Sequence, residues 1–218
     1  MFLSINLLVL DHVYLVENNY VLHDNPLITH IISLSYNKDS LALWSNYSNH
    51  EGYNIGFSKT AIIKAINDSL NKELITGFNA GKVNYSKVKQ RRILEQHIAK
   101  RYEQWKKTND NTVCILLIAD FMWYSIFFKS PKFKHEEEYR IAFAIKEQDY
   151  YKNIEFIETN QSLKPYVKIK FDCKQAVKDI TIGSKNNMDI AAAGVMHFLK
   201  KYGYNEINVK KSAITLRY

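Results

Sequence analysis

Residues 139–145 alternate between large apolar side chains and small or charged ones, and this pattern constrains the fold more than any other segment. Successive side chains of a β-strand point to opposite sides, so the alternation predicts a half-buried strand. The side facing the core would carry Tyr139, Ile141, Phe143 and Ile145. The opposite side would carry Glu136, Glu138, Arg140, Ala142 and Ala144. The chain therefore builds a sheet with charge on one face of a strand.

Shorter patterns predict the remaining strands and helices. Apolar runs bounded by turn residues indicate strands, and apolar side chains spaced three and four residues apart indicate helices. The predicted strands are residues 28–35, 53–57, 166–171, 179–182, 207–209 and 213–217. The predicted helices are residues 41–47, 60–70, 85–107 and 188–202, with a buried element of helical length at 113–128. Strands grouped around segregated helices indicate one α+β domain over residues 1–218, with a mixed or antiparallel sheet surrounded by helices.

The composition excludes several classes of protein. Seven glycines and three prolines are too few for a disordered chain. Cys114 and Cys173 lie far apart without metal-binding spacing, which favours a reducing cytoplasm. We expect no membrane segment, because the apolar run at 113–128 is short and contains Asp120, and no secretory signal is evident. The histidines are scattered, so we expect no metal site.

The positive charge is concentrated in one segment. The chain carries a net charge of +8, and residues 82–107 hold nine basic residues against two acidic ones. In the predicted helix 85–107 an apolar stripe comprises Leu94, Ile98, Tyr102 and Trp105. The opposite side carries Lys89, Lys100 and Lys107, with Arg92 nearby. This face could follow the phosphates of RNA or DNA, and the alternative is a solvated helix face.

Glu136, Glu138 and Arg140 form the first candidate site, a catalytic one. On one strand face the two carboxylates would lie about 7 Å apart, and Arg140 could pair with Glu138. The small Ala142 and Ala144 would leave open space beside the charges, as a ligand cleft requires. The alternative is an exposed strand face with Glu–Arg pairs.

Ser33, Ser35, Trp44 and Tyr47 form the second candidate site, for a cofactor. The two serines share a strand face, and the two aromatic residues lie three apart on one side of a short helix. Aromatic rings could stack on a base or a nicotinamide, while hydroxyls bind phosphate or ribose. The alternative is that Trp44 and Tyr47 are core residues that hold the helix against the sheet.

Three blocks of sequence carry a family resemblance. The first comprises residues 33–35, 41–47 and 52–57, and the second comprises residues 128–133 and 136–140. The third comprises residues 165–167, 180–183 and 211–214, with Arg217. In this order they resemble the bacterial domain-of-unknown-function family 2971, from about residue 31 to the C-terminus. That family opens with a Tyr-x-Tyr-Thr or His-Tyr-Thr strand and an Asn-Asp-x-x-Glu turn, which residues 11–14 and 24–26 match poorly. Residues 1–30 are therefore a divergent N-terminal segment, in which the opening motif has either diverged or is missing.

The paired carboxylates also resemble the Glu-x-Glu arrangement of ADP-ribosyltransferases. This resemblance implies an ADP-ribosyltransferase-like fold and an enzyme that uses NAD to modify a macromolecule. Such an enzyme would serve as a toxin or antiphage defence effector, with an inhibitory partner protein. Glu138 would oppose the positive charge that develops as nicotinamide leaves. Glu136 would orient the acceptor, and Arg140 would fix Glu138 or a phosphate.

The sequence leaves two functional hypotheses. The first is the NAD-dependent ADP-ribosyltransferase-like protein, which would act through Glu138. The second is a nucleic-acid-binding or nuclease-like module, which would act through the basic helix 85–107. Both place the protein in the cytoplasm with a macromolecular partner, without a membrane or a metal.

Overall fold

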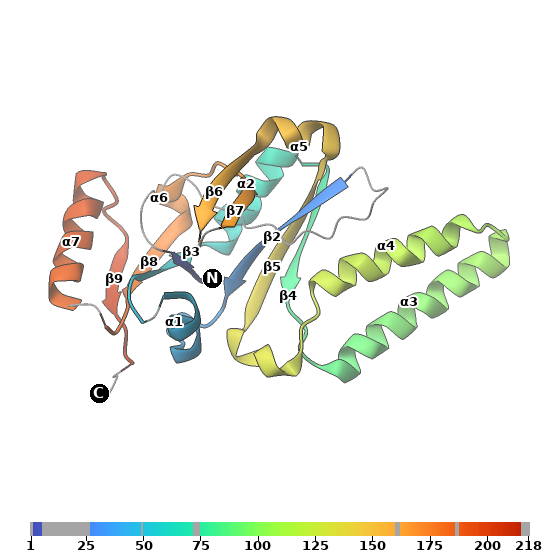
Figure 1. Ribbon diagram of the computed structural model, residues 1–218, viewed down its shortest axis with the longest axis horizontal. Coiled ribbons are helices and arrows are strands. Elements are labelled where there is room, and N and C mark those ends of the chain that lie inside the picture. The colour runs from blue at the N-terminus through green and yellow to red at the C-terminus, as the bar shows by residue number, and fades with distance from the viewer. Residues whose placement is uncertain are drawn as a thin grey trace.

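The centre of the protein is a twisted β-sheet, seen in a computed structural model that describes residues 2–5, 27–48, 50–71, 75–159, 162–185 and 188–214. The described strands form a seven-stranded sheet in the order β4-β5-β2-β1-β3-β8-β9 (Figure 1). Only the β8–β9 pair within it is parallel. The strands are β1 (Phe2–Ile5), β2 (Leu27–Ser35), β3 (Tyr53–Phe57), β4 (Gly77–Lys82), β5 (Glu138–Lys146), β8 (Val177–Ile182) and β9 (Asn208–Lys211). The fold is therefore the mixed α+β type that the sequence predicts.

The other elements surround this sheet. Strands β6 (Ile154–Thr159) and β7 (Ser162–Val167) pair as a separate hairpin. The helices are α1 (Leu41–Ser48), α2 (Lys59–Asn71), α3 (Lys87–Thr108), α4 (Thr112–Ile126), α5 (Glu147–Asn153), α6 (Cys173–Ala176) and α7 (Met188–Lys201). A 3₁₀ helix, η1 (Pro131–Glu136), leads into β5.

The two faces of the sheet are covered differently. On one face β2 and β5 pack against α2, with Phe143 and Ile66 fully buried in a core that extends to Val167 of β7. On the other face the C-terminal end of α4 packs against Ile31 and Ala142. The α3–α4 hairpin extends away from the sheet, at the opposite end of the molecule from α7 (Figure 1). The face near α4 is therefore covered only in part.

The predicted orientation of β5 is confirmed. Tyr139, Ile141, Phe143 and Ile145 all lie in the main core and expose at most 3% of their surface. The helix boundaries also have local causes. The Ser86 side chain accepts a hydrogen bond from the Lys89 backbone N–H and begins α3, and Asn109 ends that helix in the left-handed conformation. Gly203, at φ 72°, follows the end of α7.

The prediction that residues 113–128 are buried is wrong. The segment is helical, but within α4 only Val113 and Ile126 are buried. Ile115 and Ile118 expose 68% and 56% of their surface. The composition of α4 suits a core helix, yet its N-terminal half lies beyond the sheet, where little packs on it.

Smaller differences concern the sheet edges. Strand β4 was not predicted from the sequence. The strand predicted at 166–171 is largely misplaced, because β7 spans Ser162–Val167 and shares only residues 166–167 with it. Residues 213–214 are not in a strand, and residues 215–217 of that prediction lie outside the described part. Within the described residues, no helix combines the length and the hydropathy needed to cross a bilayer.

Candidate functional site

The pairing of β2 with β5 brings the two candidate sites together. Ser33 lies directly opposite Arg140, and Ser35 lies directly opposite Glu138. The serines proposed to bind a cofactor therefore share one end of the sheet with the proposed catalytic carboxylate. Ser33 is exposed, whereas Ser35 is buried.

Glu136 does not lie on the strand, contrary to the prediction. It is the last residue of η1, which begins at Pro131 after the Ser130 side chain accepts a hydrogen bond from the Lys132 N–H. Glu137 then adopts the left-handed conformation at φ 46°, and β5 begins only at Glu138. The Ser35 hydroxyl donates a 2.7 Å hydrogen bond to the Glu136 carbonyl and holds this turn. Glu136 therefore reaches Glu138 across a turn rather than along a strand.

Lys129 connects the two carboxylates. Its ammonium group contacts Glu136, and it donates to Glu138 at 2.5 Å. On the other side of Glu138, the Arg140 Nε donates at 2.7 Å, and the Arg140 Nη1 donates to the carbonyl of Ile126 at the end of α4. The side chains of Glu136 and Glu138 are only 6% and 9% exposed. We call these four residues, Lys129, Glu136, Glu138 and Arg140, the ion-pair cluster.

The pKa values of the two carboxyl groups in the cluster are shifted in opposite directions. Burial acts to raise the pKa of Glu138, but hydrogen bonds with Glu136, Arg140 and Lys129 outweigh it and lower that pKa to about 2. Burial, followed by the hydrogen bond with Glu138, raises the pKa of Glu136 above its ordinary value. Two neighbouring carboxyl groups whose pKa values differ in this way are typical of an acid–base site.

Tyr47 lies next to the cluster, and Trp44 does not reach it. Burial and the charge of Glu136 raise the pKa of the Tyr47 hydroxyl, while 62% of the residue stays exposed. Trp44 is 1% exposed and donates its indole N–H to Asp39 at 2.8 Å. Asp39 also accepts from Ser212 and from the Ala213 backbone. Tyr47 is therefore placed to contact a ligand, whereas Trp44 holds α1 in the fold.

The open space expected beside Ala142 and Ala144 is absent. These residues are 0% and 4% exposed. Ala142 packs against Ile126, with Trp123 and Phe127 around it. The small side chains let α4 approach the sheet closely instead of opening a cleft.

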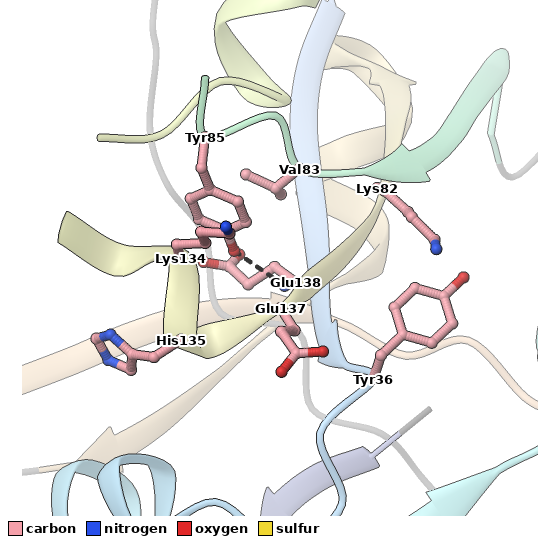
Figure 2. Close-up of a pocket in the computed structure, with 8 residues that line it drawn as sticks. All are labelled: Tyr36, Lys82, Val83, Tyr85, Lys134, His135, Glu137 and Glu138. Carbon is pink, nitrogen blue, oxygen red and sulfur yellow. Dashed lines mark hydrogen bonds between the residues drawn. The ribbon is translucent and has the colours of Figure 1, made fainter. Parts of the chain in front are cut away.

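The cleft lies elsewhere, at the start of β5. A cavity of about 500 Å³ is lined by Tyr36, Lys82, Val83, Tyr85, Lys134, His135, Glu137 and Glu138. Figure 2 shows Tyr36 and Lys82 on one side of it, Tyr85 and Lys134 on the other, and the His135 ring directed away. The Tyr85 hydroxyl accepts the backbone N–H of Glu138 at 2.9 Å (Figure 2). The volume of the cavity lies within the usual range for small-ligand sites, roughly 300–1,000 Å³.

Several of these residues could not be assigned from sequence. Lys129 precedes Glu138 by nine residues, and Tyr85 precedes it by 53, so neither spacing indicates contact. Lys129 does belong to the second block of the family resemblance, which was the one available signal. Among the described residues, no cluster of three His, Cys, Asp or Glu side chains could hold a metal ion.

The basic face of α3 is solvent-exposed. Lys89, Arg92, Lys100 and Lys107 are all exposed. None of the four forms an ion pair with another described residue. The apolar stripe of this helix is also partly in solvent, since Ile98 and Tyr102 are 46% and 53% exposed. Its cations are therefore available to a partner.

Comparison with known proteins supports the family resemblance. The sequence model of the family described as "Protein of unknown function (DUF2971)" matches residues 43–141. This stretch contains most of α1, the α3–α4 hairpin and all four residues of the ion-pair cluster. No curated protein and no solved structure matches the chain.

Proposed function

We propose that the protein is an ADP-ribosyltransferase-like enzyme that uses NAD to modify a macromolecule, with Glu138 as its catalytic carboxylate. The observation that carries this proposal is that Glu138 takes part in two features at once. It belongs to the ion-pair cluster and also lines the cavity between Tyr36 and Tyr85. A nucleotide bound in the cavity would therefore lie against an ionised carboxylate.

The lining of the cavity suits a dinucleotide. The rings of Tyr36 and Tyr85 offer apolar faces to a base or a nicotinamide. Lys82 and Lys134 bring positive charge from opposite sides, as phosphates require. Tyr47, exposed beside the cluster, would meet the acceptor or the ribose.

The two carboxylates have complementary roles in this reaction. The bond from nicotinamide to ribose breaks, nicotinamide leaves with the bonding electron pair, and positive charge develops at the anomeric carbon. Glu138 can oppose this charge because its lowered pKa keeps it ionised. The acceptor atom then bonds to the anomeric carbon and releases a proton. Glu136 can receive that proton, because burial raises its pKa towards the range of a working base.

The experiment is transfer from labelled NAD. Purified protein is incubated with labelled NAD and bacterial lysate, and nicotinamide release and label on macromolecules are both measured. The wild type and a Glu158→Gln control on the separate β6–β7 hairpin should transfer label, whereas Glu138→Gln should not. Circular dichroism checks that the variant is folded. Full transfer by Glu138→Gln, or none by the wild type, contradicts the proposal. A transferase of this kind would act as a toxin or defence effector controlled by an inhibitory partner.

A second candidate function is nucleic-acid binding through α3. The observation that favours it is the set of four exposed cations, unpaired among the described residues, on a helix that extends away from the sheet. Such a helix can approach a phosphate backbone without obstruction from the rest of the domain. Because none of these four cations lines the cavity or belongs to the ion-pair cluster, the two functions can be tested separately.

Fluorescence anisotropy with labelled RNA and DNA tests this second candidate. The triple variant Lys89→Gln, Lys100→Gln, Lys107→Gln should bind far more weakly. When the logarithm of the binding constant is plotted against the logarithm of the salt concentration, the slope should also be smaller in magnitude by about 2–3. This is near one unit for each lost phosphate contact. The control with Lys170→Gln, Lys178→Gln and Lys200→Gln removes the same charge from exposed positions elsewhere. Equal losses in both variants would show that only net charge matters.

A further inference from the structure

The α3–α4 hairpin has polar contacts between its helices and exposed apolar side chains on the opposite side of α4. Between the helices, Arg101 of α3 binds Asp120 of α4 through two hydrogen bonds of 2.8 and 3.1 Å. Beside them, the Tyr124 hydroxyl lies 2.6 Å from His97 Nε2. Paired helices usually bury their apolar stripes against each other. These polar contacts lie on the side of α4 that faces α3. The apolar side chains on its opposite side are therefore available to another partner.

The outward face of α4 is a continuous apolar stripe. At 100° per residue, Ile115, Ile118 and Met122 all lie about 140–160° around the helix from Asp120, which faces α3. Ile115 and Ile118 are 68% and 56% exposed, and Met122 is partly exposed. Their spacing of three and four residues is that of a seam between packed helices.

The stripe carries no charge of its own. Asp120 is the one ionised side chain in α4, and Arg101 pairs with it inside the hairpin. An interface related by a two-fold axis must be complementary to itself, and an uncharged apolar stripe meets this condition whereas a basic surface does not. The cations Lys89, Lys100 and Lys107 lie about 100–120° around α3 from Arg101, so they stay outside such a contact.

We propose that this stripe binds a second copy of the chain, with α4 packed against α4 about a two-fold axis near Ile118. The four helices then lie side by side in the order α3-α4-α4-α3, because the stripe is on the side of α4 opposite to α3. The basic faces of both α3 helices remain in solvent on the outside. This inference does not depend on the proposed function, because the ion-pair cluster and the cavity take no part in it.

Sedimentation velocity over a range of protein concentrations tests the dimer. The wild type should form dimers, and added salt should strengthen them because the two copies carry the same net charge of +8. Ile118→Glu should give monomers, since it places two carboxylates in the centre of the seam. Ile190→Glu, on α7 with 70% exposure, is the matched control and should remain dimeric.

A crosslink tests the geometry separately. In a Cys114→Ser background, Ile118→Cys should form a disulfide-linked dimer under mild oxidation, whereas Ile190→Cys should not. A wild type that is monomeric at every concentration overturns the proposal. So does a dimer that survives Ile118→Glu, or a monomer that instead sediments with anionic lipid vesicles.

Discussion

Glu138 of β5 lies directly opposite Ser35 of β2, and the Ser35 hydroxyl is hydrogen-bonded to the carbonyl of Glu136. The serine thereby stabilises the turn that places Glu136 beside Glu138 in the ion-pair cluster. Ser35→Ala should lower the free energy of unfolding by about 1–2 kcal/mol, because a buried carbonyl loses its donor. Urea unfolding measures this loss. Ser33→Ala, at an exposed position on the same strand, should change the value by less than about 0.5 kcal/mol, and equal losses would contradict the role of Ser35.

Lys129 neutralises two nearly buried carboxylates, so its removal should be costly. Lys129→Met should lower the free energy of unfolding at neutral pH by about 3–5 kcal/mol, because Glu136 and Glu138 then lose a shared cation. The loss should shrink in mild acid as Glu136 takes up a proton. Lys132→Met, at an exposed position of η1, is the control and should have little effect. A pH-independent loss would mean that the charge of Lys129 is not what matters.

Glu138 should make stability depend on pH in the acid range. Its pKa in the folded protein is lowered from 4.5 to about 2, so its contribution is complete above pH 4.5 and is lost as the pH falls towards 2. The contribution amounts to roughly 3 kcal/mol. Glu138→Gln should therefore be less stable than the wild type near neutrality, and the difference should shrink between pH 4.5 and 2. Urea titrations at a series of pH values would reveal a constant difference if the lowered pKa were absent.

His30 should produce a second pH dependence at higher pH. The residue is fully buried and stacks 5.5 Å from Phe143, and neither ring nitrogen has a hydrogen-bond partner among the described residues. Burial lowers its pKa from 6.5 to about 4. The unfolded chain takes up the proton first, so stability should fall by roughly 3 kcal/mol as the pH drops from 6.5 to 4.

His30→Phe provides the test, because it keeps a ring against Phe143 and removes the titrating group. The variant should lose the pH dependence between 6.5 and 4 in thermal unfolding. His197→Gln, at an exposed position of α7, should retain it. Retention of the full slope in His30→Phe would assign that slope to another group.

The sequence predicts most elements of this fold because their patterns are local. The alternation at 139–145 placed four side chains of β5 in the core, and residues 53–57 are the observed β3. The predictions that were wrong concern features that depend on contacts between residues far apart in the sequence. A helix composed like α4 indicates burial, and only the three-dimensional arrangement shows that half of it extends past the sheet.

The candidate site was predicted in part for the same reason. Glu138 and Arg140 pair as neighbours on a strand should. Glu136 was misplaced because Glu137 adopts a left-handed conformation that a glutamate does not signal. This turn is held from outside the segment, by the Asn37 side chain and by the Tyr36 backbone N–H. Lys129 could be recognised only after folding had brought it to both carboxylates.

The order of the strands has a consequence for dissecting the protein. The family match at residues 43–141 contains β3, β4 and only the first four residues of β5, and in the sheet β2 and β1 stand between β5 and β3. An excised 43–141 fragment would therefore keep β4 with the start of β5, while β3 would lose both of its neighbours, β1 and β8. The remaining residues 138–141 of β5 would lose their partner β2 and expose an open edge, able to pair with any other chain. The matched stretch is thus a unit of sequence but not a unit of folding, and its strands depend on partners from outside it.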